Sequence, residues 1–138
     1  MNNSFYQRDL IVESALKHVP MFGWTWKALD RGSKDLTDDA MLARRLFSCE
    51  LSAAADHFAD WSDRRMRNEL GKLDLSSMRV RDRIHTCVKI RIILNSTHKE
   101  AVRRFLAYLV LPHNTGLATR LSWRSCSEIW YAIGDRSA

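Results

Sequence analysis

The sequence predicts an all-α protein, and three observations support that class. Apolar residues recur at helical spacing along the 138 residues, and no stretch shows the strict alternation that is typical of a strand. Only two prolines and five glycines are present, so few positions would interrupt a long helix. The hydrophobic fraction of 46% is large enough for a buried core. We therefore expect helices that pack against other helices.

Three short helices are expected in the first third of the chain. Pro20 and Gly23 should stop the first of them, because these residue types commonly follow a helix end. Thr25 should cap the second helix, and Thr37 or Asp38 the third. The expected ranges are residues 6–18, 26–33 and 39–47. Such a group of helices is typical of a helix-turn-helix module.

The charges of this module, residues 1–48, argue against DNA binding. It contains seven Lys and Arg residues and six Asp and Glu residues, so its net charge is nearly zero. The helix expected to read DNA opens with Asp38 and Asp39, which would repel phosphate, and Arg44 and Arg45 follow only at its far end. A DNA-binding transcriptional regulator is therefore the alternative interpretation rather than the preferred one.

Four longer helices are expected in the remaining residues, 49–138. Their approximate ranges are residues 50–70, 76–94, 98–111 and 115–133. Thr97 and Glu100 should form a capping box at the start of the third. The second half of that helix, up to Leu111, is apolar around most of its circumference, which predicts a place at the buried centre. This part carries fifteen Lys and Arg against ten Asp and Glu, which favours an anionic partner or membrane surface.

The last expected helix has two apolar faces. Its core-facing stripe is predicted to be Leu117, Leu121, Ile129 and Ile133. Trp123 and Trp130 are seven residues apart, so they lie two turns from each other on a second face. Either both indoles pack internally, or this face meets a partner, a lipid or a further helix.

No catalytic or metal-binding pattern is present in the sequence. The five histidines and three cysteines are scattered, without the spacing of a zinc site or a metalloprotease helix. A nucleophile elbow and a glycine-rich phosphate loop are also absent. No apolar stretch is long enough to span a bilayer, and the N-terminus lacks the apolar core of a signal peptide. We therefore expect a non-enzymatic protein with no metal and no cofactor.

Five segments of the chain carry a distinctive order of residues. They are Ala15–Thr25 (ALKHVPMFGWT), Phe58–Met66 (FADWSDRRM), Arg79–Ile84 (RVRDRI), Leu111–Asn114 (LPHN) and Ile129–Asp135 (IWYAIGD). In this order and spacing they resemble the accessory proteins of ubiquinone biosynthesis called the coenzyme Q nine family. The resemblance covers nearly the whole chain, which makes it more specific than any single motif.

The resemblance implies a TetR-like fold, in which a degenerate helix-turn-helix module (residues 1–48) precedes a helical lipid-binding domain (residues 49–138). It implies a protein that binds an isoprenoid or phospholipid and associates peripherally with a membrane. Such a protein would present a prenylated quinone precursor to the demethoxyubiquinone hydroxylase, and a homodimer is a further expectation. The location implied is the cytoplasmic side of a bacterial inner membrane, or the matrix side in a mitochondrion.

The resemblance also assigns candidate site residues. The expected lipid pocket is lined by Ile84, Val88, Phe105, Leu109 and Leu121. The expected partner surface consists of Leu111, Pro112, His113, Asn114, Trp130 and Asp135. Taken without the resemblance, the Leu-Pro-His-Asn corner is favoured as ordinary turn chemistry. Family members continue beyond the point that corresponds to Ala138, so we expect the lipid-binding domain to be incomplete at its C-terminal end.

Overall fold

The computed structural model describes residues 3–132, and helices account for every regular element within that range. The elements are α1 (Asn3–Ala15), α2 (Val19–Phe22), α3 (Trp26–Thr37), α4 (Leu42–Leu46), α5 (Leu51–Leu70), α6 (Val80–Ser96), α7 (Lys99–Leu109), the 3-10 turn η1 (Pro112–Asn114) and α8 (Thr115–Ala132). The predicted all-α class is confirmed.

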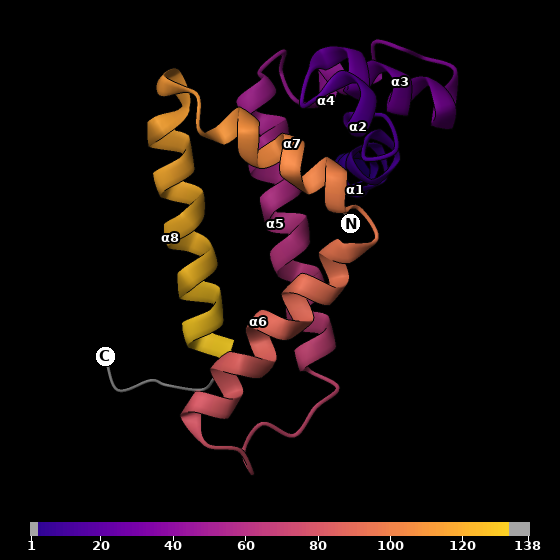
Figure 1. The fold of residues 1–138 in the computed structure, drawn as a ribbon. Helices are drawn as coiled ribbons and strands as arrows, with labels where there is room; N and C mark the ends of the chain where they lie inside the picture. Colours follow the sequence, from indigo (N-terminus) through magenta and orange to yellow (C-terminus); the bar gives the residue numbers. More distant parts are fainter. Residues whose placement is uncertain (1–2, 133–138) are drawn as a thin grey trace.

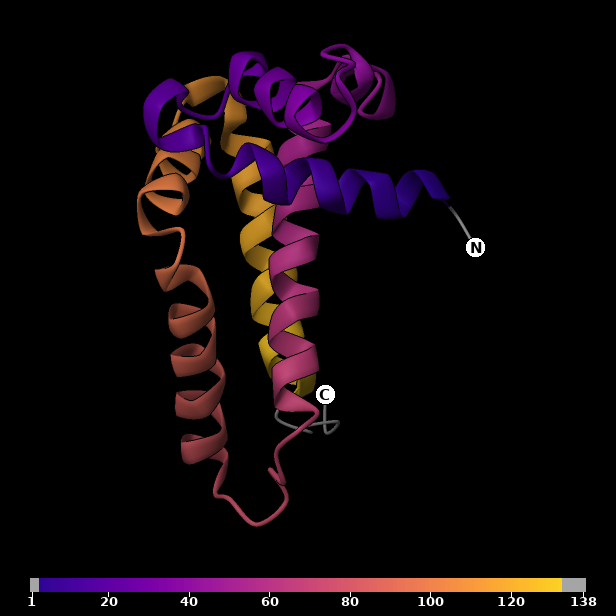
Figure 2. The same cartoon turned by 90° about the vertical axis from the view of Figure 1, so that its right-hand side faces the viewer.

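The long helix α5 is the centre of the arrangement. It contacts α1, α6 and α8, and Figure 1 shows α1–α4 gathered at one end of it. Figure 2 shows that α1 lies across α5, whereas α8 runs alongside it. Helix α7 connects the end of α6 with α8 and also contacts α2. Helices α5, α6 and α8 therefore extend away from the N-terminal group, whereas α7 lies beside it.

One hydrophobic cluster joins the N-terminal helices to α5, α7 and α8. It includes Leu16, directly after α1, and Leu29 of α3, as well as Phe58 of α5, Phe105 of α7 and Leu121 of α8. The predicted boundary after residue 48 thus falls within a continuous core, and the division into two domains stays a prediction.

Close contact between α1 and α3 depends on Gly32. A Cβ atom at this position would lie 2.7 Å from the backbone nitrogen of Ala15, so no larger residue fits without a shift of backbone. The Ser14 hydroxyl also donates a hydrogen bond to the Gly32 carbonyl oxygen at 3.0 Å. The helices can approach this closely because the side chains between them are minimal.

The N-terminal helix boundaries differ from the predicted ones. Pro20 does not end a helix but stands in the first turn of α2, where its missing N–H needs no partner. Helix α3 continues to Thr37, and Asp38 follows it as a left-handed C-cap with φ of 60°. The N-cap of α4 is Met41, so the assignment of Thr37 or Asp38 as the N-cap of the third helix was wrong. The helix expected over residues 39–47 is only the five residues of α4.

The start of α7 also differs from prediction. Thr97 precedes the N-cap, and its hydroxyl donates to the Leu94 carbonyl oxygen at 3.3 Å. The N-cap is His98, whose side chain makes no capping hydrogen bond. The predicted capping box of Thr97 and Glu100 is therefore absent, since Thr97 bonds to α6 and His98 takes the N-cap position.

Helix α7 lies at the surface, contrary to the prediction that it forms the buried centre. The side chains of Leu106 and Val110 are 54% and 79% exposed, and only Ala101 and Phe105 of the helix are buried. The central place belongs to α5, whose small residues let α1 pack closely across it. Hydrophobicity around a helix shows that it lacks a polar face, but not which neighbouring element covers it.

None of the described helices is long and apolar enough to cross a membrane.

Candidate functional site

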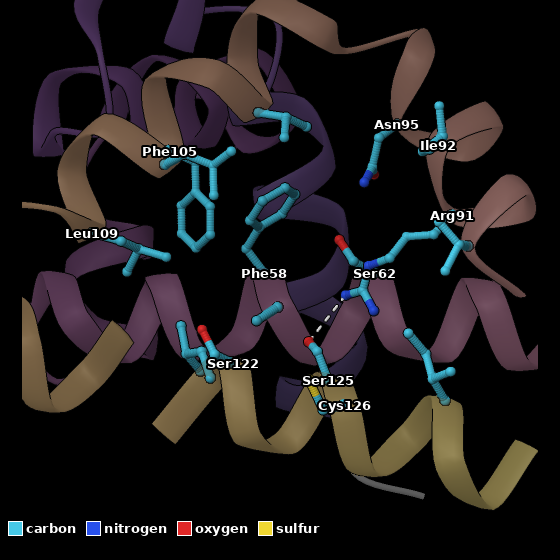
Figure 3. A pocket seen from close by; sticks show the side chains of 16 residues that line it. Phe58, Ser62, Arg91, Ile92, Asn95, Phe105, Leu109, Ser122, Ser125 and Cys126 are labelled. Carbon is cyan, nitrogen blue, oxygen red and sulfur yellow. Dashed lines mark hydrogen bonds between the residues drawn. The ribbon is translucent and has the colours of Figure 1, made fainter. Parts of the chain in front are cut away.

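An open cleft of about 450 Å³ lies between α5, α6, α7 and α8. Figure 3 shows its lining side chains, most of which are apolar. They are Phe58, Ala59 and Ser62 of α5; Val88, Arg91, Ile92 and Asn95 of α6; Val102, Phe105, Leu106 and Leu109 of α7; and Leu121, Ser122, Ser125, Cys126 and Ile129 of α8. A mostly apolar cleft of this size with a few polar groups is typical of small-molecule sites.

Aromatic packing builds one end of the cleft. The rings of Phe58 and Phe105 meet edge to face, with centroids 4.7 Å apart. Trp24 packs on Phe105 at 5.0 Å and on Phe58 at 5.4 Å, which ties this end to the N-terminal helices. Leu109 lies beside Phe105 in Figure 3. Phe58 and Phe105, supported by Trp24, form an apolar wall of the cleft. Their edge-to-face contacts add to the stabilisation that burial provides.

Charged side chains build the other end of the cleft around Asp63, which is 1% exposed. The Arg91 guanidinium donates to the Asp63 carboxylate at 2.6 Å and to the Ser125 hydroxyl at 3.2 Å. Ser125 in turn donates to Asp63 at 3.3 Å, and Arg124 Nε lies 3.9 Å from the second carboxylate oxygen. These contacts hold α5, α6 and α8 together beneath the cleft.

This end also contains buried polar atoms that have no hydrogen-bond partner among the described residues. They are Ser62 Oγ, Asp63 Oδ2, Arg91 Nη1 and Arg124 Nε. A buried polar group left in this state costs about 1–3 kcal/mol of stability. Four such atoms in one place are a departure from ordinary packing, because native interiors satisfy nearly all of their polar groups.

Four of the five residues predicted for the lipid pocket line this cleft. Val88, Phe105, Leu109 and Leu121 come from α6, α7 and α8 and surround the same space. Ile84 does not line it; its side chain lies one turn nearer the start of α6 and is 38% exposed. The structure therefore corrects the assignment of Ile84 to the lining of this cleft.

The polar residues of the cleft were missed by sequence reasoning, which selected apolar candidates only. A signal existed for two of them. Ser62 stands four residues after Phe58 on α5, and Arg91 three residues after Val88 on α6, so each shares a helix face with a predicted or observed lining residue. Helical spacing could thus have extended the candidate site to polar positions.

Curated relatives of the chain share one name. The human protein "Ubiquinone biosynthesis protein COQ9, mitochondrial" is 27% identical over 134 residues, which cover 92% of this chain and 42% of the human protein. The protein of the same name from Xenopus tropicalis is 26% identical with the same coverage. The chain is thus similar to COQ9 proteins over most of its own length. This confirms the predicted family resemblance.

The similarity to COQ9 covers only part of the COQ9 proteins. The chain spans less than half the length of the curated COQ9 relatives that it matches, including the COQ9-B protein of Xenopus laevis at 45%. No family model matches the chain. The similarity therefore describes the aligned part of the COQ9 proteins and not their whole length.

The Leu111–Asn114 corner of the predicted partner surface forms the 3-10 turn η1 and the residue before it. Leu111, Pro112 and His113 are exposed. Asn114 is buried, and its side-chain amide donates to the Tyr108 carbonyl oxygen at 2.8 Å. This hydrogen bond assigns Asn114 to the turn itself rather than to an exposed surface, which corrects its assignment to a partner surface.

The other part of the predicted partner surface consists of Trp130, near the C-terminal end of α8, and Asp135. Trp130 is 44% exposed there, and Asp135 lies outside the described residues. Because a helix rises about 1.5 Å per residue, His113 and Trp130 are separated by roughly 25 Å along α8. The structure therefore does not bring these two parts of the predicted surface together.

Both tryptophans of α8 are accessible to solvent. The side chain of Trp123 is 77% exposed, and Tyr131 beside Trp130 is 72% exposed. The interpretation in which both indoles pack internally is therefore wrong. Leu117 and Leu121 are buried as predicted, and Ile129 packs on a smaller cluster around Met66 and Cys87.

Ion pairs neutralise the arginines expected at the end of a DNA-reading helix. The Arg44 guanidinium contacts the Asp30 carboxylate at 3.0 Å, and Arg45 pairs with Asp39. Asp30 also raises the pKa of Arg44 through this hydrogen bond. Helix α4 has only five residues with which to enter a groove. These features agree with the charge balance that argues against DNA binding.

A second charged cluster connects α1 with α5. His57 Nε2 lies 2.6 Å from Asp9 Oδ1, and the Arg64 guanidinium contacts the same carboxylate at 2.6 Å. Burial lowers the pKa of His57, although Asp9 acts in the opposite direction. Burial alone would raise the pKa of Asp9, but hydrogen bonds from Arg64 and His57 lower it overall.

Among residues 3–132, no group of three or more His, Cys, Asp or Glu side chains could hold a metal ion.

Proposed function

We propose that the chain is a lipid-binding accessory protein of ubiquinone biosynthesis. In this proposal the cleft between α5 and α8 holds the apolar tail of a prenylated quinone precursor, and the protein presents that molecule to the demethoxyubiquinone hydroxylase without catalysis of its own. The observation that carries it is the open apolar cleft. The similarity to COQ9 gives the pathway in which such a ligand occurs.

The energetics favour reversible loading of a lipid tail. Each methylene that leaves water contributes about 0.8 kcal/mol, so a few carbons within the cleft give useful affinity. A lipid in a bilayer has already gained this free energy, and transfer into the cleft is therefore nearly balanced. Because the cleft is open along one side, a tail could enter and leave without unfolding of the helices. Reversible transfer is what presentation to an enzyme requires.

The surface near α6 supports peripheral contact with a membrane. Val80, Ile84 and Ile92 are exposed apolar side chains on this helix, and Arg79 and Arg81 stand exposed at its start. Cations attract anionic headgroups, and exposed aliphatic groups can enter the boundary between headgroups and tails. The corresponding membrane is the inner membrane of a bacterium on its cytoplasmic side, or of a mitochondrion on its matrix side. The relatives from three vertebrate species carry the word "mitochondrial" in their names.

In this proposal the hydroxylase contacts the exposed surface along α8. His113, in the turn η1 before α8, and Trp130, near the end of α8, mark the limits of this surface, and the exposed indole of Trp123 lies between them. A partner that covers both ends would lie along the whole helix.

Native mass spectrometry of the purified chain, with and without added prenyl quinone, tests the lipid-binding proposal. Ser122 is exposed and lines the cleft, so Ser122→Trp should fill the space without disturbing the core. Thr119→Trp places the same bulk at an exposed position of α8 that does not line the cleft. We expect a lipid adduct for the unmodified chain and for Thr119→Trp, and its loss for Ser122→Trp. Equal adducts in both variants would place the lipid elsewhere.

A further inference from the structure

We propose that the charged end of the cleft is a recognition site for the polar head of the bound lipid. Ser62 and Arg91 would donate hydrogen bonds to oxygen atoms of that head, while the tail lies toward Phe105 and Leu109. This inference rests on the proposed lipid-binding function and adds to it a fixed orientation of the ligand. The head would be one that offers acceptor oxygens, as quinones, phenols and phosphates do.

Ser62 is the first of two independent observations. Its side chain is 8% exposed and lines the cleft, and its hydroxyl has no hydrogen-bond partner among residues 3–132. Serine within a helix ordinarily donates to a carbonyl oxygen one turn earlier, as Thr86 and Thr119 do here. Ser62 does not, so its donor remains available to a ligand in the cleft.

Arg91 is the second observation. The Nη2 atom of its guanidinium donates to Asp63 and Ser125, whereas Nη1 is buried without a hydrogen-bond partner among the described residues. In Figure 3 the guanidinium extends between Ser62 of α5 and Ser125 of α8. Asp63 fixes the orientation of Nη2, which also fixes where Nη1 lies. A guanidinium held in this way is preorganised to donate to an oxygen atom.

The local charge favours an electron-rich head. Arg91 and Arg124 both approach Asp63, and Arg124 and Arg120 share Asp56 at 2.5 and 3.4 Å. The cluster thus holds three cations and two carboxylates, and its net charge is positive. The excess charge is that of Arg120, which is 62% exposed, so the attraction of an electron-rich head comes mainly from the partly buried Arg91 guanidinium.

Three ligands with the same ten-carbon tail test the proposal. Decylubiquinone carries ring oxygens, decylbenzene carries a ring without oxygen, and decyl phosphate carries an anionic head. Their dissociation constants are measured by isothermal titration calorimetry below the concentrations at which they form micelles. We expect the better of the two oxygen-bearing ligands to bind about tenfold or more tightly than decylbenzene, since a hydrogen bond to a charged group has this effect. Which of the two binds better identifies the source of the oxygen.

Two variants assign the preference to the named residues. Ser62→Ala removes a hydroxyl that has no partner, and Arg91→Lys keeps a cation opposite Asp63 but lacks the second nitrogen, so both should fold. We expect each to lower the ratio of the affinity for the oxygen-bearing ligand to the affinity for decylbenzene at least about threefold, because one hydrogen bond is lost. The matched controls are Ser127→Ala and Arg103→Lys, which do not line the cleft.

The outcomes separate this inference from the function on which it rests. If decylbenzene binds as tightly as the other two ligands, or if neither variant changes the preference, the head site is overturned while lipid binding stands. If none of the three ligands binds, the proposed function fails as well.

Discussion

The ring of Phe105 meets the ring of Phe58 edge to face, with centroids 4.7 Å apart, and this contact joins α7 to the central helix α5. Both side chains are buried, at 6% and 4% exposure, and both line the cleft. The same pair therefore stabilises the fold and forms the wall of the candidate site.

Truncation of Phe105 should cost much more stability than truncation of its neighbour. We expect Phe105→Ala to lower the free energy of unfolding by about 3–5 kcal/mol, because a buried ring is lost and a cavity remains. Leu106→Ala removes a side chain that is 54% exposed and should cost well under half as much. Urea denaturation followed by circular dichroism gives both values. Equal losses would contradict the surface position assigned to one face of α7.

The buried carboxylate of Asp63 should be essential for stability. Asp63→Asn leaves Arg91 and Arg124 without their shared anion, and breaking a buried pair costs about 3–5 kcal/mol. The exposed pair of Lys72 and Glu69 is the control, since Glu69→Gln should change stability by no more than about 0.5 kcal/mol. Chemical denaturation of both variants measures the contrast, and a tolerated Asp63→Asn would speak against the charged end as described.

Two glycines should respond oppositely to a methyl group. Gly32→Ala brings a Cβ atom to 2.7 Å from the Ala15 backbone, so we expect a loss of about 1–3 kcal/mol from overpacking. Gly116→Ala meets nothing within 4 Å in the first turn of α8 and should gain about 0.4–1 kcal/mol from reduced freedom of the unfolded chain. Thermal unfolding should give midpoints on opposite sides of the unmodified chain. A shift of both midpoints in the same direction would argue against the packing of α1 on α3.

His57 should make the fold sensitive to mild acid. Burial lowers its pKa in the folded state below the ordinary value of 6.5, so the unfolded chain binds the proton more readily. Stability is therefore fully present above pH 6.5 and declines as the pH falls below that value. His98 has a pKa lowered by burial and by Arg65, and it contributes in the same direction.

His57→Gln should weaken the dependence of unfolding free energy on pH between about 7 and 5, since one of the groups that take up a proton on unfolding is removed. NMR titration of the His57 ring should show a pKa below 6.5 in the unmodified chain. A raised value would mean that Asp9 outweighs burial, and stability would then increase as the pH falls.

The sequence predicted helices well where their ends carry strong signals and poorly where neighbours decide. The range of α5 follows from its long periodic pattern and Gly71, and the prediction of residues 50–70 differs from the observed start by one residue. The role of α7 could not be predicted, because an apolar circumference does not reveal that Leu106 and Val110 lack a covering element. Local chemistry could not show that Thr97 would bond backward to Leu94 instead of forward.

The candidate site was predictable on its apolar side only. Val88, Phe105, Leu109 and Leu121 are large and apolar, and the resemblance placed them on the central helices. The pairing of Asp63 with Arg91 joins residues 28 positions apart on different helices, and no local spacing encodes such a contact. Charged residues in a sequence usually indicate solvent-exposed positions. The burial of this cluster is therefore visible only from the packing of α5, α6 and α8.

The location of a bound tail tests the account most directly. A prenyl quinone with a photoreactive diazirine at the tail end can be bound to the chain, activated with light, and mapped by mass spectrometry of the peptides. We predict adducts on the segments that contain Phe58 and Phe105–Leu109, lost in Ser122→Trp and retained in Thr119→Trp. Adducts spread over the exposed face around Trp123, and unaffected by Ser122→Trp, would contradict a cleft that holds lipid.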